Sequence, residues 1–219
     1  MPGSLEEARA IQAELNRRLD EEPSINSGEL TLVAGMDVSY GISSAYACVV
    51  MTDYPGLSFR SRFEALSPLR FPYIPGLFAF REIPALQEAF SLVSPRPDLL
   101  LVHGHGYAHP RRMGLARHFG ALMRIPSIGI AGRILQGMEV SDPGTSRGAY
   151  SPILMDNEVV GVVLRSRQGV KSVCVSAGYR TTLAQAQEIT LSCCVESRFP
   201  EPMMRANRAA RRMRRRCEG

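Results

Sequence analysis

Residues 30–65, LTLVAGMDVSYGISSAYACVVMTDYPGLSFRSRFEA, decide the fold of this chain because they are dense in β-branched and aromatic residues. Two short turn sequences, Gly41-Ile-Ser-Ser44 and Asp53-Tyr-Pro-Gly56, interrupt the stretch. Connections this short join neighbouring strands that run in opposite directions. The stretch therefore predicts an antiparallel meander of three strands, at residues 30–40, 45–52 and 57–65.

Apolar runs and helical patterns alternate after residue 65. Residues 98–102 form a short apolar run, which is typical of a central strand covered on both faces. A second buried strand is predicted at 125–131, and the helices at 79–93 and 111–123 give an alternating order that favours parallel pairing. Further strands are predicted at 152–155, 158–166 and 171–177, helices at 4–20 and 182–196, a loop at 21–28 and a flexible excursion at 132–150.

These elements predict a single α/β domain over residues 1–204, with a ribonuclease H-like mixed sheet: an antiparallel three-strand meander plus parallel strands, flanked by helices. The length of 219 residues and an apolar fraction of 45% suit one well-filled core. The five cysteines form no C-x-x-C pair and are expected to be free, mostly buried thiols. No apolar run approaches the roughly 20 residues that span a bilayer, and the first residues lack the pattern of a secretory signal. We therefore expect a cytoplasmic protein without a membrane partner, with a monomer favoured.

Residues 205–219 are predicted to form an arginine-rich C-terminal tail. Seven of the 26 basic residues lie between Arg205 and Arg216, so the rest of the chain carries slightly more acidic than basic residues. A basic arm binds polyanions such as nucleic acid through counterion release. A solvated tail without a partner is the alternative.

Three residues are candidates for catalysis and for metal binding. Asp37 lies inside an apolar strand, where a carboxylate is costly unless it is paired or holds a metal. Glu82 begins a helix after a proline-rich loop, where an acid also suits the helix dipole. His103 ends the central strand, and ligands in open α/β sheets gather at such strand ends.

All four histidines lie between His103 and His118. His103 and His105 have the spacing of a zinc-binding pair, but no cysteine or third carboxylate is spaced to complete that site. His118 is expected to pack in the core.

Two loops are candidates for binding nucleic acid. The glycine-rich stretch 104–114 exposes backbone N–H groups to a phosphate or base edge, and Arg111 and Arg112 are expected phosphate contacts. Tyr73 lies on a loop stiffened by Pro72 and Pro75, where an aromatic side chain acts as a wedge between bases or simply packs.

Several blocks occur together in an unusual combination, of which the most specific runs from Pro72 to Leu86 and contains Tyr73-Ile-Pro-Gly76. The others are Ala34-Gly-x-Asp-Val38, Pro97-Asp98, Gly104-His-Gly106, His109-Pro-Arg-Arg112, Gly114, Ala116, His118-Phe-Gly120, Pro126-x-Ile-Gly129 and Pro200-Glu-Pro202. In these blocks, over roughly residues 5–205, the chain resembles the endonuclease V family, which cuts nucleic acid near deoxyinosine or inosine.

The resemblance implies a ribonuclease H-like fold in which Asp37 and Glu82 help to bind Mg²⁺. It also implies that a flipped hypoxanthine is extruded by a wedge and held in a pocket, which costs less for a weakly paired base. The implied wedge residues are Tyr73, Ile74 and Pro75, and the implied pocket residues are Gly76, Phe78, Gly104, His109 and Leu115.

Three positions depart from the family pattern: His103 replaces an aspartate, Gly132 a lysine, and Tyr179 the histidine of a Thr-Gly-His-Arg turn. Imidazole in place of a carboxylate weakens Mg²⁺ binding more than Mn²⁺ binding. The sequence therefore predicts impaired or Mn²⁺-preferring cleavage of DNA or RNA near hypoxanthine, with Arg133 as a substitute for the missing lysine charge. A catalytically inactive protein that binds inosine-containing or branched nucleic acid is the alternative.

Overall fold

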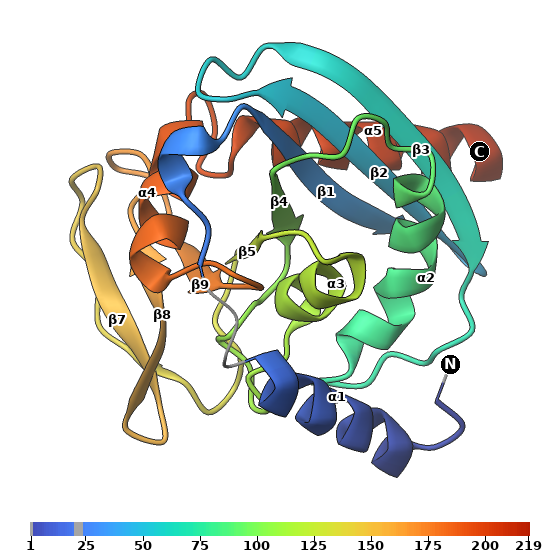
Figure 1. Ribbon diagram of the computed structural model, residues 1–219, viewed down its shortest axis with the longest axis horizontal. Helices are drawn as coiled ribbons and strands as arrows, with labels where there is room; N and C mark the ends of the chain where they lie inside the picture. The colour runs from blue at the N-terminus through green and yellow to red at the C-terminus, as the bar shows by residue number, and fades with distance from the viewer. Residues whose placement is uncertain (1, 20–23) are drawn as a thin grey trace.

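The computed structural model describes residues 2–19 and 24–219, and its strands form one mixed sheet (Figure 1). Within this described part the sheet has nine strands in the order β3-β2-β1-β4-β5-β9-β8-β7-β6. The strands are β1 Leu32–Tyr40, β2 Ser44–Asp53, β3 Phe59–Pro68, β4 Leu99–His103, β5 Ser127–Ala131, β6 Glu139–Val140, β7 Tyr150–Met155, β8 Glu158–Leu164 and β9 Val173–Ala177.

The pairing of the strands confirms the predicted mixed sheet. β1, β2 and β3 form the antiparallel meander, while β1, β4 and β5 run parallel to one another. β9 joins β5 in the antiparallel sense and leads into the β8-β7-β6 extension. Part of the 132–150 stretch, expected as a flexible excursion, is ordered as β6 and pairs with β7.

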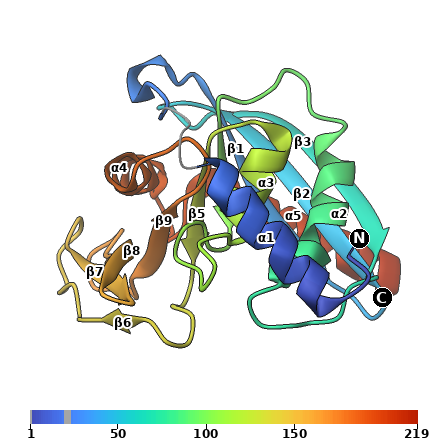
Figure 2. The same ribbon diagram turned by 60° about the horizontal axis from the view of Figure 1, so that its bottom comes forward.

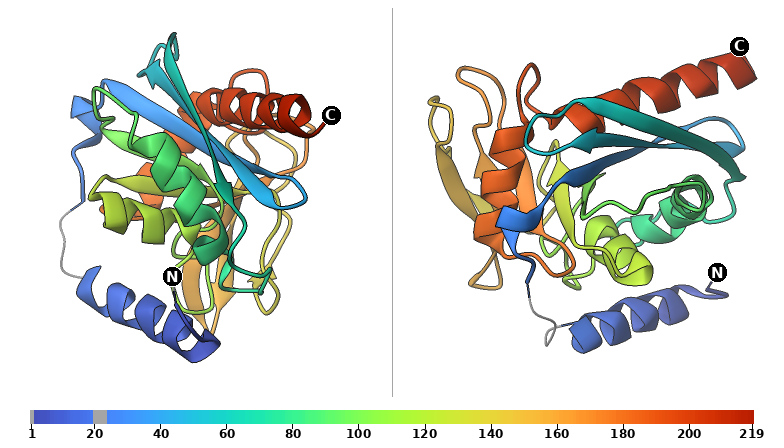
Figure 3. Two further views of the ribbon diagram at one scale, coloured as in Figure 1. Left: turned by 90° about the vertical axis from the view of Figure 1, so that its right-hand side faces the viewer. Right: turned by 45° about the horizontal axis from the view of Figure 1, so that its top comes forward.

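Helices cover both faces of the sheet (Figure 3). Alternate residues of each strand point to opposite faces, so Ala34 and Met36 of β1 face α2 and α3, whereas Val33 faces the α4 side. α1 packs outside α3 (Figure 2). The helices are α1 Leu5–Leu19, η1 Ser27–Glu29, α2 Phe78–Phe90, α3 Leu115–Met123, α4 Leu183–Cys193 and α5 Glu201–Glu218.

The cysteines agree with the expectation of free, mostly buried thiols. Cys48, Cys174, Cys193 and Cys194 are buried free thiols, and Cys217 is exposed. None of the helices in the described part of the chain has the length and apolar character that crossing a membrane requires.

Helix α3 begins four residues later than the sequence pattern indicates. Residues before it form a turn in which Arg112 has a φ of 54°. Gly114 caps the helix because its N–H donates to the carbonyl of Gly106 at 2.9 Å, and a Cβ at this position would lie 2.3 Å from the His105 oxygen. The glycine-rich loop therefore folds back against the start of α3. The helix begins at Leu115 and not near Pro110.

The arginine-rich segment forms most of α5, which packs on the sheet, whereas we expected an arm outside the domain. Ala206, Ala209 and Ala210 are buried against Cys48 and Val50 of β2. At its far end Glu218 accepts hydrogen bonds from the backbone N–H of Ile42 (3.2 Å) and the Tyr46 hydroxyl (3.1 Å). Small residues at helical spacing between the arginines give α5 its buried face.

Gly35 is the point at which α5 crosses β1 most closely. A Cβ at Gly35 would lie 2.1 Å from the carbonyl carbon of Pro202. We predict that Gly35→Ala lowers the free energy of unfolding by about 2 kcal/mol or more, because a rigid backbone cannot move aside for the added methyl group. Gly56→Ala, whose Cβ would meet open space, is the control and should change stability by less than about 0.5 kcal/mol. Urea unfolding of both variants measures the difference; equal stabilities would contradict the close crossing.

Candidate functional site

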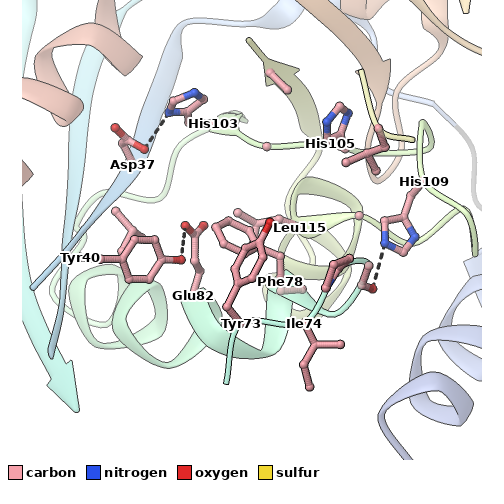
Figure 4. A pocket seen from close by; sticks show the side chains of 18 of the residues that line it. Asp37, Tyr40, Tyr73, Ile74, Phe78, Glu82, His103, His105, His109 and Leu115 are labelled. Carbon is pink, nitrogen blue, oxygen red and sulfur yellow. Dashed lines mark hydrogen bonds and ion pairs between the residues drawn. The ribbon is translucent and has the colours of Figure 1, made fainter. Parts of the chain in front are cut away.

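A pocket of about 590 Å³ opens at the carboxyl ends of β4 and β5. Its walls come from β1, the loop before α2, α2 itself, the loop after β4, and α5 (Figure 4). Each of the predicted metal, wedge and base-pocket residues lines this one pocket: Asp37, Glu82, His103, Tyr73, Ile74, Pro75, Gly76, Phe78, Gly104, His109 and Leu115.

Asp37 and His103 lie side by side because β1 and β4 are parallel, with Met36 opposite Val102. The Nδ1 atom of His103 is 2.9 Å from Oδ1 of Asp37. Burial lowers the pKa of His103, but the hydrogen bond and charge of Asp37 raise it above its ordinary value, against the smaller opposing charges of Arg198 and Arg211. Asn207 of α5 donates its side-chain amide to the other oxygen, Oδ2, so both oxygens of Asp37 have protein partners.

Glu82 points into the same pocket from the second turn of α2, which begins at Phe78 and not at Glu82 as expected, and it accepts a hydrogen bond of 2.6 Å from the Tyr40 hydroxyl. Burial raises the pKa of Glu82 to about 8; the Tyr40 hydrogen bond lowers it, the charge of Asp37 raises it, and Arg81 lowers it. The protonated carboxyl group is therefore the main form at neutral pH in this arrangement.

The wall around Gly76 is built from oriented polar groups. Gly76 has a φ of 76°, which glycine adopts without strain, and its carbonyl accepts hydrogen bonds from His109 Nε2 (3.0 Å) and from Arg111 (2.5 Å). Burial, followed by the charge of Arg111, lowers the pKa of His109 to about 4, so the imidazole is neutral at pH 7. Its Nδ1 accepts from the Arg111 N–H at 3.2 Å, which leaves Nε2 to carry the proton.

Tyr73 stands at the rim of the pocket with 68% of its surface exposed. Its ring meets the ring of Phe78 edge-on, with centroids 5.9 Å apart. Behind it, Ile74 packs against the apolar cluster that contains Phe71 and Phe80. The loop is thus anchored by Ile74, while the aromatic ring of Tyr73 faces outward.

Arg111 and Arg112 bind protein groups rather than standing free. Arg111 joins Gly76 to α1, because its Nε donates to the side-chain oxygen of the buried Gln12 at 2.7 Å. Arg112 pairs with Glu158 at 2.7 Å. The phosphate contacts expected of these two arginines stay predictions, and each guanidinium has a structural role.

The remaining histidines do not form a metal site with His103. His105 is partly buried and hydrogen bonds to the backbone of Arg133, and desolvation lowers its pKa to about 4. Within residues 2–19 and 24–219 no group of three or more His, Cys, Asp or Glu side chains lies close enough to hold a metal ion. His118 packs edge-on against Phe80, as expected of a core histidine, with centroids 5.2 Å apart.

Two of the three departures from the family pattern lie outside the pocket lining. The Tyr179 carbonyl accepts from the backbone N–H of Ser127, and the Tyr179 N–H donates to the Ser127 hydroxyl. Ser127 is the first residue of β5, whereas the pocket opens beyond the last one. We therefore correct the expectation that Tyr179 acts at the active site. Gly132 follows the pocket residue Ala131, and a Cβ on it would lie 3.3 Å from the guanidinium of Arg198. The positive charge next to Gly132 is thus that of Arg198. Arg133, which was expected to replace the charge of the missing lysine, has an exposed side chain that does not line the pocket.

The sequence analysis missed several lining residues, of which four bear on the chemistry of the pocket. Tyr40 is the donor to Glu82. Asn207, Arg211 and Arg214 come from α5 at intervals of four and three residues, the spacing of one helix face. That spacing was visible in the sequence, but the segment had been interpreted as a tail.

Comparison with known proteins agrees with this site. The endonuclease V family model matches residues 13–208. Endonuclease V of Roseiflexus sp. (strain RS-1) is 41% identical over 95% of this chain and 93% of its own length. The crystal structure of endonuclease V from Streptomyces avermitilis superposes with a TM-score of 0.93 at 38% identity, covering 100% of this chain and 96% of the other. Endonuclease V of Ciona intestinalis, solved in complex with a 24mer DNA containing an inosine followed by a ribo-adenosine, superposes with a TM-score of 0.86 at 27% identity over 98% and 99% of the two chains. The chain belongs to the endonuclease V family.

Proposed function

We propose that this protein binds a hypoxanthine base everted from DNA or RNA and hydrolyses a nearby phosphodiester with a bound divalent metal, preferring Mn²⁺ to Mg²⁺. One observation carries the proposal: a single pocket contains Asp37 and Glu82 at one end and the walls of a slot around Gly76 and Leu115 at the other. The inosine-containing DNA bound to the Ciona relative supports the choice of substrate.

The slot suits a flat, polar-edged base. Phe78 and Leu115 supply apolar walls. A Cβ at position 104 would lie 3.1 Å from the Leu115 side chain, so glycine at this position leaves room beside Leu115. The backbone groups of Gly76 and Gly104 provide polar contacts for the edge of a base. Eversion is easier at an inosine pair than at a normal pair, and Tyr73 at the rim would fill the space that the base leaves.

The side chains around Asp37 fit a borderline metal ion better than Mg²⁺. The donors would be the carboxylates of Asp37 and Glu82, the imidazole of His103 and the amide oxygen of Asn207, and they would have to move together around the ion, because Asp37, Glu82 and His103 as described do not lie close enough to hold one. Only two of these four groups carry negative charge, and one is a nitrogen ligand, which Mn²⁺ tolerates and Mg²⁺ disfavours. When bound, the ion would activate a water molecule and stabilise charge on the phosphate oxygens.

A second candidate function is binding of the everted base without cleavage. In the arrangement described, Asp37 already accepts hydrogen bonds from His103 and Asn207, and Glu82 accepts one from Tyr40. Binding a metal ion would displace these donors and require Glu82 to release its proton to solvent, while the base slot needs no such change. Cleavage assays separate the two functions.

The metal preference is tested on an inosine-containing strand with Mg²⁺ and then with Mn²⁺. We expect slow cleavage with Mg²⁺ and cleavage at least about tenfold faster with Mn²⁺. His103→Asp should raise the Mg²⁺ rate because it adds a hard, charged oxygen ligand, whereas His103→Asn, of similar size but neutral, should not.

Rapid Mg²⁺ cleavage that His103→Asp leaves unchanged would contradict the Mn²⁺ preference. No cleavage with either metal, together with tighter binding to inosine than to adenosine strands, would favour the second candidate function.

The wedge is tested by Tyr73→Ala, with Tyr150→Ala as the control because Tyr150 is also an exposed tyrosine, 57% accessible, and lies on β7 away from the pocket. We expect Tyr73→Ala to weaken binding to an inosine-containing duplex by about tenfold, since loss of one stacking contact costs roughly 1–3 kcal/mol. Binding to the matched duplex without inosine should change little. Equal losses on the two duplexes would contradict a wedge.

The protonation of Glu82 is tested on the metal-free protein through stability. The pKa of Glu82 is raised in the folded state, so its contribution to stability is fully present below about pH 4.5 and is lost as the pH rises toward about 8. Between pH 5 and pH 8 the free energy of unfolding of the natural protein should therefore fall by a few kcal/mol relative to Glu82→Gln, because one pKa unit corresponds to about 1.4 kcal/mol. Urea unfolding in EDTA measures this. Glu88→Gln, an exposed position on the same helix, should leave the pH dependence unchanged; an identical pH dependence in the natural protein and Glu82→Gln would disprove the raised pKa.

A further inference from the structure

Helix α5 presents one face to the pocket. Asn207, Arg211 and Arg214 line it, while Arg208 and Arg215 of the same helix are exposed and do not. The face is fixed in place, because Ala209 and Ala210 on the neighbouring side of α5 are buried against β2. The two pocket-facing arginines are therefore held by the fold rather than by a mobile tail.

The two arginines differ in what their guanidinium groups bind. Arg214 donates to the backbone carbonyl of Tyr40 at 2.9 Å. Arg211 is exposed, and within residues 2–19 and 24–219 it has no hydrogen bond or ion pair. It lies close enough to His103 for its charge to act on that imidazole. Arg211 thus places five unused N–H donors at the edge of a pocket that contains two carboxyl groups.

A phosphodiester that enters this pocket needs a positive charge beside it. Asp37 and Glu82 would repel the phosphate wherever they are ionised, and a guanidinium binds phosphate oxygens through two parallel hydrogen bonds. Arg111 and Arg112, the arginines nearest to the base slot in sequence, are already paired with Gln12, Gly76 and Glu158. Arg81 and Arg198, whose charges also act on Glu82 and His103, donate to the backbone carbonyls of Phe71 and Ser172 and do not line the pocket. The arginines that do line the pocket, Arg211 and Arg214, both belong to α5.

We propose that Arg211, supported by Arg214, forms a phosphate-binding subsite that holds the phosphodiester next to the everted base. This inference rests on the proposed function, because the phosphate is that of the same nucleic acid whose base enters the slot. It assigns to one residue of the arginine-rich segment a defined contact, in place of a diffuse attraction spread over all seven arginines.

The test compares Arg211→Ala with Arg208→Ala, which removes the same charge from the same helix one turn earlier, outside the pocket lining. Binding to a single-stranded oligonucleotide with one central inosine is measured in EDTA, where no cleavage occurs, over a series of salt concentrations. We expect Arg211→Ala to lose about tenfold in affinity and to reduce the slope of log K against log salt by about 0.7, the value for one phosphate contact. Arg208→Ala should leave the slope within about 0.2 of that of the natural protein.

Single neutral methylphosphonate replacements along the oligonucleotide then locate the contact. At one position beside the inosine the natural protein should lose about tenfold in affinity, and Arg211→Ala should lose almost nothing further, because the contact is already absent. The same loss in both proteins at every position, or equal slopes for the Arg211 and Arg208 variants, would overturn the subsite. Discrimination between inosine and adenosine strands by the natural protein is scored separately: its absence refutes the proposed function, whereas its presence with equal slopes refutes only the subsite.

Discussion

The parallel pairing of β1 with β4 is the constraint on which the rest of the site depends. It sets Asp37, in the middle of β1, beside His103, the last residue of β4, with Nδ1 and Oδ1 2.9 Å apart. A carboxylate this deeply buried must be compensated, and here the compensation comes from two hydrogen-bond donors on separate elements, an imidazole from β4 and an amide from α5. The position of α5 on the sheet follows from the same requirement, because Asn207 must reach Asp37.

The polar groups in the two halves of the pocket have their hydrogen-bond partners arranged in different ways. Around Gly76 the polar groups have their partners within the protein and keep fixed orientations, so this half is ready to receive a ligand without rearrangement. Around Asp37 and Glu82 the partners occupy the positions that an ion would take, and burial keeps a proton on Glu82. Binding a base would therefore require no rearrangement of the pocket, whereas binding a metal ion would require the partners of Asp37 and Glu82 to move.

The sequence predicted the sheet because strands and turns depend on local patterns, whereas the residues expected in the base pocket came from the family resemblance, and the structure brings them to one cavity. Alternation and short turns specify the meander, and the Pro72–Leu86 block carries its own stiffness and its own contacts. The prediction failed where contacts between distant parts of the chain determine the structure. Helix α5 was mistaken for an arm because its arginines dominate the composition, and only packing on Gly35 and β2 shows that the alanines between them form a buried face. Tyr179 was placed at the site by resemblance alone, and the direction of β5 puts it at the opposite edge.

The location of Asn207 and Arg211 on the last helix has a consequence for the order in which the protein matures. During translation the strands and the slot around Gly76 emerge first, and a chain that has been made only as far as residue 200 lacks the amide that compensates Asp37. The carboxylate end of the pocket is finished only when α5 docks. A ribosome-bound nascent chain can thus contain every strand of its sheet before the residues that complete the pocket have been made.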